Sequence, residues 1–145
     1  MNLLFSKLPI TRLKLLVAQV LFLLVKPFYG VKKRIIRRNG LVFEVDITEG
    51  LDLSLFLFGN FQKHVSDNKF IHLPPDAVIF DVGANVGIMA LHFAQHAPKG
   101  EVYAFEPTHY AFGKLLRNIS LNTGLMSKIR PNQAFITSLE KKVAP

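Results

Sequence analysis

The hydrophobic pattern of the chain is clearest at residues 78–80, where Val, Ile and Phe follow one another without polar alternation. Such a run predicts a strand that is buried on both faces of a sheet. An acidic residue and a Gly-x-x-x-Gly turn follow, and residues 88–94 then have the pattern of a helix. A strand, a glycine turn and a helix together present free backbone N–H groups to a ligand at the helix N-terminus.

The same alternation of strands and helices continues along the chain. We expect a helix at about 86–96, a second strand at 101–106 and a helix from Thr108, a plausible N-cap, to about Asn122. Residues 129–137 predict a third strand. Strand–helix repeats with short connections indicate parallel strands joined by right-handed crossovers, so the predicted fold class is α/β and Rossmann-like.

A β-hairpin is predicted upstream, over residues 31–47. Asn39-Gly40 is the strongest short signal for a two-residue hairpin turn. With this turn one face of the hairpin is apolar, and Lys33 lies opposite Asp46 as a favourable cross-strand pair. The basic run 32–38 is therefore interpreted as a solvated strand with charge partners, in preference to a nucleic-acid or phospholipid patch.

The segments on either side of the hairpin have helical patterns. Residues 50–73 predict a helix that breaks at Gly59-Asn60, with a second helix at about 61–68. Residues 1–30 are apolar and basic, and their charge-free run of eleven residues, 15–25, is shorter than the ~20 that a membrane span needs. Three interpretations stay open for this segment: a helix packed on the domain or a partner, an interfacial anchor, or a cleaved signal peptide. The predicted divisions are thus 1–30, 31–76 and 77–145.

Composition and charge narrow the class of protein. Half of the residues are hydrophobic, which argues against disorder, and the absence of cysteine excludes disulfides and fits a cytoplasmic location. Residues 1–40 hold nine Lys or Arg and no Asp or Glu, whereas residues 41–145 hold nine Lys or Arg and ten Asp or Glu. The net charge of +8 therefore belongs to the N-terminal arm. We therefore expect no nucleic-acid partner for the folded domain, and allow a peripheral membrane contact through residues 1–40.

The glycine turn matches one of three nucleotide-binding patterns. A P-loop is excluded, because the position five residues after Gly83 is Ile88 and no lysine follows. The dinucleotide pattern is weak, because Asn85 stands at its second glycine and Ile88 at its third. The remaining pattern, Asp-x-Gly-x-x-x-Gly, resembles the first nucleoside-binding loop of S-adenosylmethionine (SAM) methyltransferases. Asn85 can replace a glycine there, since Asn tolerates positive φ.

An acid at the end of the second strand supports the nucleoside interpretation. Glu106 lies 19 residues after Gly87, where a ribose-binding carboxylate is expected. Gly83 and Gly87 allow close backbone approach to the ligand. Asp81 is expected to brace the loop or to reach the ligand's ammonium group. A tight strand–helix connection without a ligand is the alternative.

Five stretches of the chain, at 49–54, 57–61, 81–87, 103–107 and 118–122, resemble the FkbM-type SAM-dependent methyltransferases. The resemblance covers roughly residues 40–137. It implies a class I methyltransferase fold, SAM as the cofactor, and O-methylation of a hydroxyl on a sugar or secondary metabolite, so a small-molecule or glycan acceptor. The cofactor-binding residues that follow from the loop and the resemblance are Asp81, Gly83, Ala84, Asn85, Gly87, Glu106 and Pro107.

The family's fold has seven strands and this chain offers three, so we expect a partial fold with the cofactor half present and the acceptor half absent. No catalytic base is identified. His92 and His96 have metal-ligand spacing, but without a third ligand they are interpreted as helix-surface residues, and no metal is predicted. Two alternative functions stay open: a truncated remnant without catalysis, and a membrane-associated module acting through the basic arm.

Overall fold

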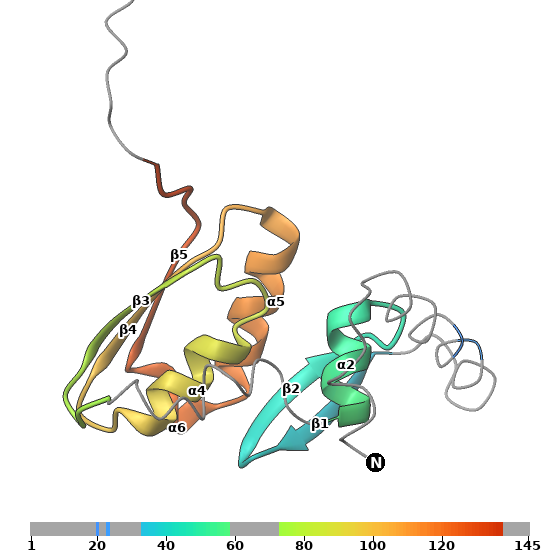
Figure 1. Ribbon diagram of the computed structural model, residues 1–145, viewed down its shortest axis with the longest axis horizontal. Helices are drawn as coiled ribbons and strands as arrows, with labels where there is room; N and C mark the ends of the chain where they lie inside the picture. The colour runs from blue at the N-terminus through green and yellow to red at the C-terminus, as the bar shows by residue number, and fades with distance from the viewer. Residues whose placement is uncertain (1–19, 21–22, 24–32, 59–72, 138–145) are drawn as a thin grey trace, which may run out of the picture. The chain divides into compact units, whose positions relative to one another are not determined.

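A computed structural model describes residues 20, 23, 33–58 and 73–137 of this chain (Figure 1). The chain divides into two compact units, residues 1–36 with 44–61 and residues 37–43 with 62–145. The elements in chain order are β1 (Arg34–Arg38), β2 (Leu41–Val45), α2 (Gly50–Phe58), β3 (Val78–Val82), α4 (Ile88–His96), β4 (Glu101–Phe105), α5 (His109–Ser120), α6 (Thr123–Met126) and β5 (Ile129–Asn132).

The second unit contains a parallel sheet in the order β3-β4-β5. The register sets Phe80 beside Tyr103, and Tyr103 beside Arg130. Each pair of neighbouring strands is joined through a helix, α4 between β3 and β4 and α5 between β4 and β5. The predicted α/β arrangement of three parallel strands is confirmed.

The core of this unit lies between the sheet and its helices, which cover one face (Figure 1). The β4 side chains that point to this face, Val102 and Ala104, are fully buried, as are Leu91 of α4 and Leu115 of α5. Apolar residues at helical spacing on α5 make its buried stripe. The packing of the sheet on its helices therefore places the ends of β3 and β4 beside each other.

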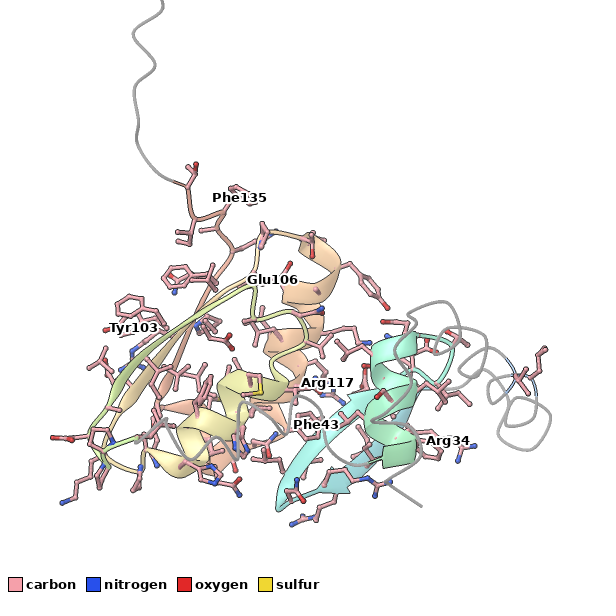
Figure 2. All side chains as sticks on the ribbon, in the orientation of Figure 1. Arg34, Phe43, Tyr103, Glu106, Arg117 and Phe135 are labelled. Atoms are coloured by element: carbon pink, nitrogen blue, oxygen red, sulfur yellow. The ribbon has the colours of Figure 1, made fainter. Side chains whose placement is uncertain are left out.

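The opposite face of the sheet is open among the described residues. Val78, Phe80 and Val82 are 63%, 65% and 62% exposed, so the prediction that this strand is buried on both faces is wrong. The physical reason is that β3 is an edge strand of the described sheet and that the described helices cover only the other face. The Phe80 ring stacks on Tyr103, at 5.3 Å between centroids, and Figure 2 shows Tyr103 projecting away from the helices.

Two boundaries in this unit differ from the predictions. The third strand ends at Asn132 and not at 137, with Pro131 inside it. Proline has no N–H to donate, which is tolerated because β5 is also an edge strand of the described sheet. The short helix α6 follows α5, where the sequence predicted only that the preceding helix ends near Asn122.

The hairpin forms as predicted. Strands β1 and β2 pair, and both turn residues have positive φ, 51° at Asn39 and 81° at Gly40, as a type I′ turn requires. Alternate β2 side chains are buried. Lys33 Nζ lies 3.7 Å from Glu44 Oε1, and the Asp46 carboxylate accepts hydrogen bonds from Thr48. The predicted position of Lys33 opposite Asp46 stays a prediction.

The predictions for residues 1–30 and 61–68 lie outside the described residues, apart from Val20 and Leu23, which are helical. The three predicted divisions of the chain stay predictions. No described helix is both long enough and apolar enough to cross a membrane. The proposed membrane contact of residues 1–40 also stays a prediction.

Candidate functional site

The turn between β3 and α4 is held by backbone hydrogen bonds to the next strand. The N–H groups of Gly83 and Ala84 both donate to the Phe105 carbonyl at 2.9 Å, and Gly87 N–H donates to the Ala84 carbonyl at 2.9 Å. Three residues have positive φ: Gly83 (79°), Asn85 (50°) and Gly87 (85°). Asn85 therefore occupies the left-handed conformation that we expected it to tolerate in place of glycine.

Gly87 is the N-cap of α4 and lies against α5. A Cβ at this position would stand 2.5 Å from the Leu115 Cδ1, closer than real Cβ contacts allow. The positive φ favours glycine, and an added Cβ would in addition have to displace the end of the Leu115 side chain. The close approach holds the N-terminus of α4 against α5.

Glu106 follows directly after β4 and joins the two loops at this end of the sheet. Its side chain is only 6% exposed. Oε2 accepts the Asn85 N–H at 3.0 Å, and Oε1 accepts both the N–H and the hydroxyl of Thr108, at 2.9 and 2.5 Å. Burial raises the pKa of this carboxyl, but the three hydrogen bonds outweigh burial and hold its pKa below the ordinary value. Glu106 is therefore ionised at neutral pH.

Asp81 lies on β3 and faces the first turn of α4. Burial raises the pKa of its carboxyl, and a hydrogen bond from the Ala90 backbone N–H acts in the opposite direction. Ala90 is the third residue of α4, and its N–H is a group that an N-cap side chain normally satisfies. Since Gly87 has no side chain, Asp81 does this from the strand. Its Oδ2 atom is buried and has no hydrogen-bond partner.

The structure thus brings together most of the predicted site residues. Asp81, the loop 83–87 and Glu106 lie at the same end of β3 and β4, where Figure 2 labels Glu106. Ala84 is buried, whereas Pro107 is exposed. Contact of these residues with a ligand stays a prediction.

Three residues that sequence analysis did not assign to the site also belong to this arrangement. Thr108 stands at the N-cap of α5, but its side chain does not cap the helix and donates to Glu106 instead. Asn118, 1% exposed, donates from Nδ2 to the Val86 carbonyl at 2.8 Å. Asn122 donates to the Asn118 carbonyl at 2.8 Å. The sequence signal that could have identified Asn118 and Asn122 is the presence of two amide side chains, four residues apart, on the apolar stripe of the predicted helix.

No family model matches this chain. A segment of 65 residues is 35% identical to the methyltransferase sdnD of Sordaria araneosa, covering 45% of this chain and 24% of that protein. A segment of 64 residues is 42% identical to the AMB antimetabolite synthetase AmbE of Pseudomonas aeruginosa, covering 44% of this chain and 3% of that protein. The matches thus span only a small part of either curated relative.

Among solved structures, TYW2 of M. jannaschii in complex with AdoMet is similar over 73% of this chain and 45% of its own, with 24% identity and a TM-score of 0.53. This likeness shows the fold: the sheet and helices of the second unit form part of a class I, Rossmann-like methyltransferase fold. The narrower resemblance to the FkbM family stays a prediction.

Proposed function

We propose that the loop 83–87 and Glu106 bind SAM, and that this chain supplies the cofactor-binding part of a SAM-dependent methyltransferase. The observation that carries the proposal is the hydrogen bond from the Asn85 N–H to the Glu106 Oε2. It joins the acid after the second strand to the glycine loop after the first, so that both lie at the carboxyl ends of adjacent parallel strands. Ligands of open α/β sheets bind at this edge.

The chemistry of the site fits a nucleoside that carries an amino acid. Glu106 is ionised, and a carboxylate has about four acceptor positions, of which the described bonds use three. A ribose hydroxyl can therefore still donate to it. The Oδ2 atom of Asp81 is a buried acceptor without a partner, which suits the ammonium group of the methionine portion. Gly83, at φ 79°, leaves the backbone open, with no atom within 4 Å of a Cβ position.

SAM supplies an activated methyl group on its sulfonium, so the protein needs no nucleophile. The contribution of the protein is alignment and, for a hydroxyl acceptor, a base. We further propose O-methylation of a hydroxyl on a sugar or secondary metabolite. The family resemblance supports this acceptor class, and the similarity to a curated methyltransferase supports the reaction type. The fold supports SAM as the cofactor.

Isothermal calorimetry with SAM tests the cofactor assignment. In Glu106→Ala we expect the dissociation constant for SAM to rise by at least about tenfold, since a hydrogen bond to a charged group contributes about 1.5–3 kcal/mol. Glu101→Ala is the matched control, because Glu101 lies at the other end of the same strand, where its exposed side chain forms an ion pair with Arg130. Unchanged SAM affinity in Glu106→Ala would remove Glu106 from the ribose site.

A further inference from the structure

We propose that Asn118 is a positioning residue for the loop 83–87, and that Asn122 connects this loop to the segment 37–43. The proposal rests on the proposed function, because the loop is the proposed SAM site. Its structural basis is a continuous chain of hydrogen bonds within the second unit: Val86 to Asn118, Asn118 to Asn122, and Asn122 to Val42.

The bond from Asn118 controls the last peptide of the loop. The α4 ladder begins at Gly87, whose carbonyl accepts the Leu91 N–H at 3.0 Å, so the Val86 carbonyl lies outside the ladder. Asn118 Nδ2 binds this carbonyl at 2.8 Å from a site that is 1% exposed. Because the peptide is planar and trans, the direction of the Val86 carbonyl also sets the opposite direction of the Gly87 N–H. That N–H closes the turn onto Ala84.

Asn118 is well placed for this role because α5 touches the loop at two successive positions on one face. Leu115 lies against the Gly87 backbone, and Asn118, three residues later, lies against the Val86 carbonyl. Leu115 is fully buried, so the contact surface is dry. A hydrogen bond in such a setting is strong, and its loss leaves a buried carbonyl unsatisfied.

Asn122 carries the connection further. Its Oδ1 accepts the Val42 N–H at 2.9 Å, and its Nδ2 donates to the Val42 carbonyl at 2.7 Å and to the Asn118 carbonyl at 2.8 Å. Both donor hydrogens of the amide are therefore used, and the side chain pairs with Val42 as a neighbouring strand would. Gln95 adds a second tie to this segment by donating to the Asn39 carbonyl at 3.1 Å. By linkage, a ligand that orders the loop must also stabilise the Val42 contact.

Amide hydrogen exchange in the ligand-free protein tests the positioning role independently of SAM. In Asn118→Leu, which removes the donor, we expect the protection of the Gly87 N–H relative to the Val102 N–H of β4 to fall by about tenfold. The control is Ile119→Ala, since Ile119 is 5% exposed at the next position of α5 and makes no side-chain hydrogen bond. That variant loosens α5 but should leave the protection ratio unchanged. An unchanged ratio in Asn118→Leu, or an equal fall in the control, overturns the proposal.

Calorimetry on the same variants then measures the functional consequence. We expect the SAM dissociation constant of Asn118→Leu to rise about tenfold and that of Ile119→Ala to stay within about twofold of the wild type. Added SAM should raise the protection of the Val42 N–H in the wild type but not in Asn118→Leu. If the wild type does not bind SAM, the proposed function fails while the ligand-free exchange ratio still decides the positioning role.

A second variant keeps the test decisive if Asn118→Leu does not fold. In Asn118→Asp the ionised carboxylate cannot donate to the Val86 carbonyl, whereas the protonated acid can. The Gly87 to Val102 protection ratio of this variant must therefore rise as the pH is lowered. A ratio that does not depend on pH overturns the proposal.

Discussion

Substitution of Gly87 by alanine separates two physical reasons for a glycine in the loop. The φ of 85° is left-handed, which costs an alanine about 1–2 kcal/mol. The new Cβ would also lie 2.5 Å from the Leu115 Cδ1, and overpacking of this kind costs about 1–3 kcal/mol. We therefore expect Gly87→Ala to lower the free energy of unfolding by about 2–5 kcal/mol.

Two other glycines provide matched controls. Gly83 has a φ of 79° but no atom within 4 Å of its Cβ position, so Gly83→Ala should show only the conformational cost of about 1–2 kcal/mol. Gly113 lies inside α5 and also has an open Cβ position, without a left-handed φ. Gly113→Ala should raise the free energy of unfolding by about 0.5–1 kcal/mol, because alanine is the better helix former.

Urea unfolding, followed by far-ultraviolet circular dichroism because the chain has no tryptophan, measures all three variants. At a constant m-value the urea midpoints should fall in the order Gly113→Ala, wild type, Gly83→Ala, Gly87→Ala. Equal midpoints for Gly83→Ala and Gly87→Ala would show that Leu115 does not constrain the loop. A Gly83→Ala midpoint equal to the wild type would refute the conformational argument itself.

Three further predictions concern the carboxylates and the activity. Burial raises the pKa of Asp81, so its ionised form is disfavoured in the folded protein. Asp81→Asn should therefore be more stable to urea than the wild type at pH 7, yet bind SAM about 10–100-fold more weakly by calorimetry. If Asp81→Asn binds SAM as tightly as the wild type does, Asp81 does not contact the ammonium group. The pKa of Glu106 is lowered, so its stabilising contribution is present above the ordinary carboxyl pKa and is lost as the pH falls through the lowered pKa. Urea midpoints of Glu106→Gln should therefore decrease less on acidification than those of the wild type, and parallel curves would contradict this. Finally, we expect the purified 145-residue chain to bind SAM without transferring its methyl group, since no base for an acceptor is identified among the described residues. Transfer of label from radiolabelled SAM to an acceptor would show this expectation to be wrong.

The parts of the site that could be predicted depend on local chemistry. Gly83, Asn85 and Gly87 were recognisable because few residues adopt positive φ, and the structure confirms that conformation at all three. Glu106 was recognisable from its spacing, since parallel strands of similar length bring their carboxyl ends together. The hairpin turn at Asn39-Gly40 was predictable for the same local reason.

The parts that could not be predicted depend on contacts between distant residues. The apolar run of β3 predicted burial on both faces, but local hydrophobicity does not reveal which elements cover a sheet, and Phe80 is 65% exposed. Thr108 has the residue type and position of an N-cap, yet the buried acceptor of Glu106 competes successfully for its hydroxyl. The partner of Asn118 lies 32 residues away in sequence, so no spacing rule identifies it.

The hydrogen bonds of Glu106 also set a condition on the proposed SAM site. Oε1 already accepts two bonds from Thr108, and Oε2 accepts one from Asn85, so a carboxylate with about four acceptor positions has room for one more donor. A ribose that binds through both hydroxyls must therefore displace the Thr108 hydroxyl, whose bond then has to be replaced. Weaker SAM binding in a Glu106 variant will consequently combine a lost ligand contact with a loosened loop. Exchange of the Gly87 N–H in the ligand-free protein separates the two, because this group donates to the Ala84 carbonyl and not to Glu106, so only loosening of the loop changes it.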